Sequence, residues 1–341
     1  MRILVIAPSW LGDLVMSQSL YKAIKKANPD ATIDLYALKW MFPIIKRMDE
    51  VNNVIENPFA HGSFDFLKRK NEGVKLRGKY DKAIILPNSW KSALVPFFAG
   101  VKERCGFIGE SRYFLLNDYR NNKKDFPLMV ERYSALAFSK DSVKTAQDLP
   151  DILYPSLKTQ EPSCDLLEKL NLSLSRPLLA LGCGANYGPS KLWPPEYFAE
   201  VADKWIEKGG AVLGIGSKND IPTVNKIKER IDVRHLSYFY DIAGKTNLVE
   251  ALDLTAKAAA AVCNDSGLMH LVAAVGVPQV AIFGSTSTGY TPPLSDRAVC
   301  LESDEPCHPC FERTCKFKTY ACLKKITPNL VIEQLAKLTG I

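Results

Sequence analysis

The sequence lacks the features of a membrane-spanning, repetitive or disordered chain. No apolar run approaches the roughly 20 residues that a transmembrane helix needs. The N-terminus has one arginine and a short apolar run that ends in a turn, without the small-residue cleavage site of a secretory leader. No repeat period and no low-complexity segment is evident. With 47% hydrophobic residues the chain has ample material for packed cores, and we expect a cytoplasmic protein.

The chain also lacks a large excess of charge of either sign. Lysine and arginine number 44 against 37 aspartates and glutamates, a net charge of +7 without long basic blocks. The densest clusters are Lys68 to Lys70 and the stretch 102–132. A phosphorylated substrate, an anionic membrane surface or a nucleic acid could use such a patch, and solvated helix faces explain it equally well. No nucleic-acid motif accompanies the small excess, so we expect no nucleic-acid partner.

The order of apolar runs predicts an α/β protein of two domains. Strand-like runs alternate with helical stretches, which implies doubly wound parallel sheets covered by helices on both faces. The polar stretch 148–163 contains several prolines and is the best linker, so we expect domains at 1–160 and 161–341. The final amphipathic stretch 328–338 could pack back across the junction onto the first domain. The predicted strands are 3–7, 32–37, 82–86, 178–182, 211–215, 260–263 and 279–283.

The first thirteen residues carry the clearest functional signal. An apolar run from Ile3 reads as a buried parallel strand and meets a small-residue turn that ends in Asp13. Asp13 then opens the amphipathic stretch 14–27, which places its carboxylate just beyond a strand's carboxyl end, where open α/β sheets bind ligands. Asp13 is thus a candidate catalytic base. The alternative is a helix N-cap, a common position for aspartate.

In the second half, several loops leave the same edge of the predicted sheet and outline a nucleotide pocket. A glycine-rich loop, 182–190, follows a predicted strand and leads to Lys191, whose charge suits a phosphate. The segment 263–270 follows another strand and begins a helix near Ser266, whose N-terminal N–H groups suit a diphosphate. A plain capped helix with a buried histidine is the alternative. The donor-side candidates are Lys191, Asp265, Ser266, Gly267, His270 and Asp220.

The first half repeats the pattern of strand, polar turn and helix at 86–100. Lys91 lies in the first turn of that predicted helix, where acidic residues are usual, so we expect an anion nearby. Arginines follow in the same domain, among them Arg112, and solvated side chains are the alternative. The candidates for the second ligand are Ser9, Trp10, Gly12, Ser89, Lys91 and Arg112.

The nine cysteines fall into two groups. Four thiols within sixteen residues, Cys307, Cys310, Cys315 and Cys322, could hold a structural zinc ion, or remain unliganded in a surface loop. Only one pair has the Cys-x-x-Cys spacing. The other five lie among apolar neighbours and are predicted to be reduced core residues: Cys105, Cys164, Cys183, Cys263 and Cys300.

Taken together, these segments resemble glycosyltransferase family 9, the lipopolysaccharide core heptosyltransferases that use ADP-heptose. The resemblance runs from the first residue to the last helix. The segments that carry it are 8–13 (Pro-Ser-Trp-Leu-Gly-Asp), 87–96 (Pro-Asn-Ser-Trp-Lys-Ser-Ala-Leu-Val-Pro), 190–194 (Ser-Lys-Leu-Trp-Pro), 243–246 (Ala-Gly-Lys-Thr) and 264–270 (Asn-Asp-Ser-Gly-Leu-Met-His).

The resemblance implies a GT-B architecture, two facing Rossmann-like domains with the acceptor on the first and ADP-heptose on the second. It further implies transfer of L-glycero-D-manno-heptose to the Kdo-lipid A inner core, with inversion and without a bound metal. Asp13 matches the family's catalytic base, and Lys191 and the segment 265–270 match its donor-binding positions. A lipid-linked acceptor implies peripheral contact with the inner membrane, through Lys68 to Lys70 or Phe97 and Phe98. The alternatives are a family member with another core acceptor and a nucleotide-binding protein without transferase activity.

Overall fold

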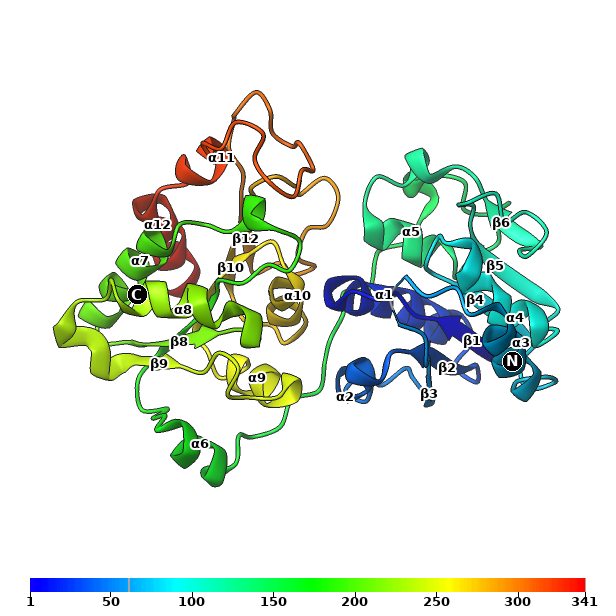
Figure 1. Cartoon of the computed structure of the whole chain (residues 1–341), viewed down its shortest axis with the longest axis horizontal. Coiled ribbons are helices and arrows are strands. Elements are labelled where there is room, and N and C mark those ends of the chain that lie inside the picture. Colours follow the sequence, from blue (N-terminus) through cyan, green and yellow to red (C-terminus); the bar gives the residue numbers. More distant parts are fainter. Residues whose placement is uncertain (61, 341) are drawn as a thin grey trace. The chain divides into compact units, whose positions relative to one another are not determined.

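The computed structural model describes residues 1–60 and 62–340 and divides the chain into two compact units, 1–155 and 156–341. Each unit holds a six-stranded parallel sheet in the part of the chain that is described (Figure 1). The predicted α/β class, with two doubly wound sheets, is confirmed. The units divide five residues before the expected boundary, inside the predicted linker.

Unit 1 has the strand order β3-β2-β1-β4-β5-β6, so β1 lies between β2 and β4. Chain connections run in opposite directions on either side of the β1/β4 neighbours, which makes the carboxyl ends of these strands the topological switch point. The strands are β1 Arg2–Ile6, β2 Thr32–Ala37, β3 Asn53–Glu56, β4 Lys82–Ile85, β5 Glu103–Phe107 and β6 Asp118–Arg120. The helices are α1 Leu11–Ala27, α2 Phe42–Ile45, α3 Phe66–Lys75, α4 Leu94–Phe98 and α5 Met129–Ala135.

Unit 2 repeats this order as β12-β11-β10-β7-β8-β9, with its switch point between β7 and β10. The strands are β7 Leu178–Gly182, β8 Ala211–Ile215, β9 Phe239–Asp241, β10 Ala260–Asn264, β11 Gln279–Ile282 and β12 Ala298–Leu301. The helices are α6 Cys164–Leu170, α7 Pro195–Glu207, α8 Ile221–Lys228, α9 Leu248–Thr255, α10 Gly267–Ala274, α11 Ala321–Lys324 and α12 Pro328–Thr339.

The sheet of unit 2 separates two hydrophobic clusters. Successive residues of a strand point to opposite faces, and β7 accordingly contributes Leu179 and Leu181 to one cluster and Leu178 and Ala180 to the other. The first cluster contains side chains of α7 and α12, the second side chains of α9 and α10. Burial on both faces explains why the central strands are continuous apolar runs in the sequence.

All seven predicted strands are present, and two smaller predictions need correction. Helix α1 begins at Leu11, three residues earlier than expected, because the turn after β1 is already helical there. Cys164 is exposed at the start of α6 and is not a core residue, although Cys105, Cys183 and Cys263 are buried. The C-terminal helix α12 packs against α7 and contacts β10 and β11 of its own unit. Among the described residues, no helix is both long and apolar enough to span a membrane.

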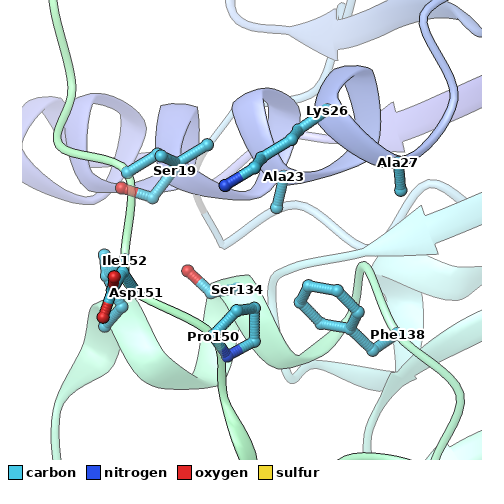
Figure 2. Close-up of a pocket in the computed structure, with 10 residues that line it drawn as sticks. Ser19, Ala23, Lys26, Ala27, Ser134, Phe138, Pro150, Asp151 and Ile152 are labelled. Carbon is cyan, nitrogen blue, oxygen red and sulfur yellow. The ribbon is translucent and has the colours of Figure 1, made fainter.

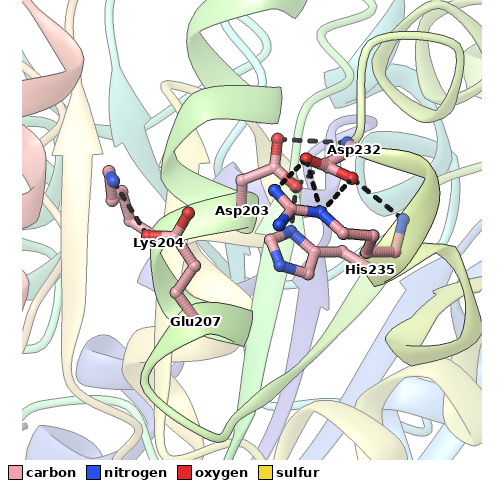
Figure 3. Close-up of polar contacts among 6 residues, drawn as sticks. Asp203, Lys204, Glu207, Asp232 and His235 are labelled. Atoms are coloured by element: carbon pink, nitrogen blue, oxygen red, sulfur yellow. Dashed lines mark hydrogen bonds and ion pairs between the residues drawn. The ribbon is translucent and has the colours of Figure 1, made fainter.

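A polar network fixes the helix α7 to the short 3-10 helix 233–238 that precedes β9 (Figure 3). Asp203 of α7 lies 2.7 Å from His235 Nδ1 and accepts a hydrogen bond from the backbone N–H of Asp232 at 3.1 Å. The Arg234 guanidinium donates to Asp232 at 2.6 Å and holds the pKa of that carboxyl well below its usual range. These contacts lie at one edge of the unit 2 sheet and leave its switch point free.

Candidate functional site

At the switch point of unit 2, Lys191 and Asp265 form an ion pair. Lys191 ends the 3-10 helix Pro189–Lys191 after β7, and Asp265 follows β10 directly. Because β7 and β10 are parallel neighbours, their carboxyl ends bring the two side chains together. Asp265 Oδ2 accepts from Lys191 Nζ at 2.5 Å and from the Thr286 hydroxyl at 2.5 Å. Asp265 is 3% exposed, so its contact with the lysine replaces the water that burial removes.

The loop that carries Lys191 is held by buried hydrogen bonds. The Asn264 side-chain amide donates to the Cys183 carbonyl at 2.7 Å and its oxygen accepts from the Trp193 backbone N–H at 3.1 Å. The Ser190 hydroxyl is hydrogen-bonded to the Ser285 hydroxyl at 2.9 Å. These bonds reach the loop on both sides of Lys191, which fixes the ammonium group before any ligand arrives.

Helix α10 begins beside this ion pair. Its N-cap, Ser266, has extended backbone and makes no side-chain capping bond. The first N–H groups of the helix, from Gly267 onward, therefore remain available to an anion, and the helix dipole adds partial positive charge there. His270 lies one turn on and is 4% exposed. Burial lowers its pKa to about 4, so the ring is neutral at pH 7 and offers a hydrogen bond rather than a charge.

Asp220 shapes the glycine-rich loop from the next strand along. Its carboxylate accepts from the Ser217 backbone N–H and hydroxyl, both at 2.7 Å, as the acid of a capping box. A Cβ at Gly184 would lie 2.2 Å from Asp220 Oδ1. The loop therefore needs glycine at 184 because Asp220 occupies the space of a side chain. These contacts give Asp220 a structural part in the site; direct donor binding by its carboxylate stays a prediction.

In unit 1, Asp13 lies in the first turn of α1, after the carboxyl end of β1. The N-cap position of α1 is held by Trp10, which makes no side-chain capping bond, so Asp13 is not the N-cap residue of this helix. The Tyr133 hydroxyl of α5 donates to Asp13 Oδ1 at 3.2 Å. Asp13 is half-buried, and this combination of partial exposure and a positioned neighbour suits a general base.

The other candidates of unit 1 follow the same two strands. Ser9, Trp10 and Gly12 come after β1, and Trp10 is 47% exposed. Ser89 precedes the 3-10 helix Trp90–Ala93, which contains Lys91, after β4. Since β1 and β4 are parallel neighbours, these residues and Asp13 share the edge of the sheet at which the switch point lies.

Arg112 holds a loop in place and does not have the ligand-binding role predicted for it. Its side chain is fully buried and donates to the carbonyls of Pro87 at 2.7 Å, Ser89 at 3.0 Å and Phe107 at 2.8 Å. Burial lowers its pKa to about 10, which leaves it charged at pH 7. The prediction that Arg112 contacts a ligand fails, because its guanidinium is enclosed by the loop that it holds. Arg112 positions Ser89 instead.

Sequence reasoning did not identify two residues of these sites, Thr286 and Tyr133. Thr286 follows β11, the parallel neighbour of β10, so strand-end positions could have suggested it. Tyr133 lies 120 residues from Asp13, and no local pattern indicates that the two meet.

The four C-terminal cysteines do not form the predicted zinc site. Among the described residues, no group of three histidine, cysteine or acidic side chains is arranged to hold a metal ion. Cys307 and Cys310 are exposed, and Cys315 and Cys322 are half-buried. Backbone N–H groups of Tyr320, Phe317 and Thr319 donate to the Cys315 sulfur and lower its pKa. These four cysteines are thus free thiols, and neighbouring residues of the same loop contact Cys315.

Comparison with known proteins gives a consistent result along the whole chain. The profile of glycosyltransferase family 9 (heptosyltransferase) matches residues 72–321. Lipooligosaccharide heptosyltransferase 2 of Haemophilus influenzae is 45% identical over 99% of both chains. Lipopolysaccharide heptosyltransferase 2 of Escherichia coli is 43% identical over 99% of this chain and 98% of its own. The structure of E. coli ADP-heptose LPS heptosyltransferase II superposes with a TM-score of 0.89 at 41% identity, covering 100% of this chain and 99% of that one.

Proposed function

Since the chain belongs to glycosyltransferase family 9 (heptosyltransferase), we propose that it is the second heptosyltransferase of lipopolysaccharide core synthesis. It is a glycosyltransferase of the two-unit α/β class called GT-B. The proposed reaction moves L-glycero-D-manno-heptose from ADP-heptose to the first heptose of the Kdo-lipid A inner core. The likeness to relatives named heptosyltransferase 2, at 43–45% identity over 99% of the chain, carries this choice.

The donor, ADP-heptose, is assigned to the switch point of unit 2. The N–H groups at the start of α10 and the Lys191 ammonium are suited to a diphosphate. Lys191 is paired with Asp265 at 2.5 Å, so it acts as one half of a positioned pair. Its charge and the helix dipole would stabilise the negative charge that develops on the departing ADP, without a metal ion in that part.

Asp13 is assigned as the general base of an inverting displacement. Inversion in a single step requires one base, which removes the proton of the acceptor hydroxyl while that oxygen attacks the anomeric carbon. The half-buried carboxylate at the carboxyl end of β1 is suited to this part, and the hydrogen bond from Tyr133 orients it. Trp10, Ser89 and Lys91 are the proposed acceptor contacts at the same sheet edge.

The central experiment compares Asp13→Asn with the unchanged protein. We expect transfer to fall by about 100-fold or more, in the range of general-base catalysis, while calorimetry shows ADP binding retained. Asp30→Asn, an exposed acid in the turn after α1, is the matched control and should transfer normally. Unchanged turnover in Asp13→Asn would remove this carboxylate from the reaction. Loss of folding, visible in the melting temperature, would separate structural damage from loss of the base.

Transfer assays with a panel of acceptors test at which step of core synthesis the enzyme acts. Kdo-lipid A carrying one heptose should accept a second heptose, whereas heptose-free Kdo-lipid A should not. Activity on the heptose-free acceptor alone would favour the first heptosyltransferase, and activity only on longer cores the third. ADP binding without transfer to any core acceptor would favour a nucleotide-binding protein on the same scaffold.

Peripheral contact with the inner face of the inner membrane is also proposed, through an exposed aromatic ridge on unit 1. The ridge is a chain of ring contacts at 5.4–6.2 Å between centroids, and it consists of Phe64, Phe66, Trp90, Phe97, Phe98 and Phe114. Leu67 beside it is 72% exposed. Lys68 and Lys70 are exposed on the same helix, whereas Arg69 is buried and holds the Phe64 carbonyl at 2.7 Å. Aromatic rings together with lysines suit an anionic lipid interface.

Vesicle sedimentation tests this surface. The protein should bind vesicles that contain anionic lipid more strongly than neutral ones, and added salt should weaken the binding. Leu67→Glu should reduce sedimentation several-fold, whereas Val233→Glu, at a position of unit 2 that is 77% exposed, should not. Equal loss in both variants would contradict the assignment to the ridge.

A further inference from the structure

Arg313 lies against the glycine-rich loop of unit 2, although the two are distant in the sequence. The Ser190 backbone N–H donates to the Arg313 carbonyl at 3.2 Å, and the Ser190 hydroxyl donates to the neighbouring carbonyl of Glu312. At Gly188, an added Cβ would clash with the Arg313 carbonyl oxygen. These contacts fix the backbone of Arg313 beside Ser190, the residue that precedes Lys191.

The side chains of Arg313 and Lys191 contact the same aromatic ring. The guanidinium carbon of Arg313 lies 5.3 Å from the centroid of the Tyr187 ring, and Lys191 Nζ lies 4.9 Å from it. The two cations are therefore no more than about 10 Å apart, the sum of these distances. The Tyr187 hydroxyl donates to the Phe311 carbonyl, which fixes the ring. An aromatic face of this kind holds a cation without neutralising its charge.

The positive charge of Arg313 is not matched by an acid. Lys191 is paired with Asp265 at 2.5 Å, and Glu312 is paired with Lys316 at 2.7 Å. Arg313 is exposed and forms no ion pair within the part of the chain that the structure describes. Because the Lys191–Asp265 pair carries no net charge, Arg313 and the start of α10 supply the uncompensated positive charge at this loop.

The groove of unit 1 between α1, α5 and residues 150–153 shows the contrasting case (Figure 2). Its lining includes one lysine, Lys26, and one aspartate, Asp151, and its other lining residues are uncharged. Charges of both signs in one lining select neither an anion nor a cation. The unmatched guanidinium of Arg313, by contrast, favours an anion at the loop to which it is attached.

We propose that Arg313 is a donor-binding residue whose guanidinium contacts the diphosphate of ADP-heptose; the identity of this donor rests on the proposed function. A guanidinium can donate two parallel hydrogen bonds to one phosphate group. During transfer, the bond from the anomeric carbon to the diphosphate oxygen breaks and its electron pair stays on that oxygen, while the acceptor oxygen bonds to the carbon. The negative charge of the departing ADP grows in this step, and Arg313 stabilises it together with the start of α10.

Binding of ADP and of adenosine, measured by calorimetry and ligand-observed NMR, tests the contact. Arg313→Gln should weaken ADP binding about tenfold or more, the usual effect of losing a hydrogen bond to a charged group. Adenosine binding should stay unchanged, because adenosine has no phosphate, whereas a role limited to holding the loop would weaken both ligands alike. Unchanged ADP affinity in Arg313→Gln, or equal weakening of ADP and adenosine, would overturn the inference.

Two further variants separate a direct contact from the effect of net charge. Arg313→Lys keeps the charge and should recover part of the ADP affinity that Arg313→Gln loses. Lys324→Gln removes an equal charge from an exposed position of α11 and should bind ADP normally. Added salt should weaken ADP binding less in Arg313→Gln than in the unchanged protein. Equal losses in Lys324→Gln and Arg313→Gln would contradict a direct contact.

Transfer assays test the stabilisation of the departing ADP. At saturating donor and acceptor, kcat of Arg313→Gln should fall about tenfold, because the charge on the diphosphate is larger in the transition state than in the bound donor. The melting temperature should not change, since the substitution keeps the backbone contacts of residue 313. A kcat equal to that of the unchanged protein would overturn this part. Failure of the unchanged protein to bind ADP at all would instead overturn the proposed function, and this inference with it.

Discussion

The buried histidine of α10 gives the proposed donor site a measurable pH dependence. Burial lowers the pKa of His270 from 6.5 to about 4, while Asp265 raises it and Lys191 lowers it. The folded protein therefore holds the ring neutral at a pH at which the unfolded chain has already bound a proton. Stability from this group is complete above pH 6.5 and is lost progressively as the pH falls toward 4.

The size of the effect follows from the same values. A difference of about 2.5 in pKa, at roughly 1.4 kcal/mol for each, amounts to about 3 kcal/mol of unfolding free energy. His270→Gln keeps a polar side chain and removes the titration. The difference in unfolding free energy between the unchanged protein and this variant should thus shrink by about 3 kcal/mol between pH 7 and pH 4.

Urea unfolding over this pH range measures that difference, and NMR titration of the ring signals reports the pKa directly. Met269→Leu, a neighbouring buried substitution in the same helix, is the control. It should lower stability by an amount that does not depend on pH. A His270 ring that titrates near 6.5, or a difference between His270→Gln and the unchanged protein that stays constant with pH, would refute the argument from burial.

Three further substitutions test the contacts that hold the loops. Trp193→Phe loses the bond from Nε1 to the Ile326 carbonyl at 2.8 Å and leaves a void, so urea unfolding should show a loss of about 2–4 kcal/mol; a loss below about 1 kcal/mol would contradict this. Gly184→Ala should lower both the melting temperature and ADP affinity, since Asp220 occupies the space of the added Cβ. The double variant with Asp220→Ala should therefore lose less stability than the sum of the losses in the two single variants. Strictly additive losses would argue against the clash. Arg112→Lys cannot reproduce the guanidinium fork, so thermal unfolding should show a loss of about 2–4 kcal/mol of stability; full stability would show that the carbonyls find other partners.

Seven of the eight interior strands described could be predicted from sequence, because burial on both faces makes them continuous apolar runs; the exception is β5, whose sequence Glu-Arg-Cys-Gly-Phe begins with two charged residues. The edge strands could not. Strand β6 has only three residues, Asp118–Arg120, and β3 reads Asn-Val-Ile-Glu with both ends exposed. An edge strand pairs with a neighbour on one side only, so its other side can face water and its sequence need not be a continuous apolar run. Their pairing is fixed by the strands that precede them in the sheet.

The candidate donor site was predictable to a similar degree. Lys191 and Asp265 follow strands that the apolar runs identify, and the parallel pairing of β7 with β10 brings their ends together. Their mutual ion pair was not predictable, because a lysine and an aspartate at neighbouring strand ends can each contact a ligand or contact one another. Tyr133 required the folded chain, since it reaches Asp13 across 120 residues of sequence, whereas Thr286 follows β11, the parallel neighbour of β10, and its position could have suggested it.

Arg112 and Lys191 show why charge in a sequence is a weaker guide than position. Lys191 is predicted to meet an anion because it follows a strand and a glycine-rich loop, and Arg112 is predicted to do so as one of the arginines that follow Lys91 in the first domain. Lys191 stays at the sheet edge, 12% exposed, with its ammonium on a carboxylate. Arg112 is fully enclosed, and its two terminal nitrogens donate to three loop carbonyls and the Ser92 hydroxyl in a fork that a lysine could not reproduce. A buried cation of this kind fixes the shape of residues 87–92, and the proposed acceptor contacts at Ser89 and Lys91 therefore depend on a residue that does not itself touch the acceptor.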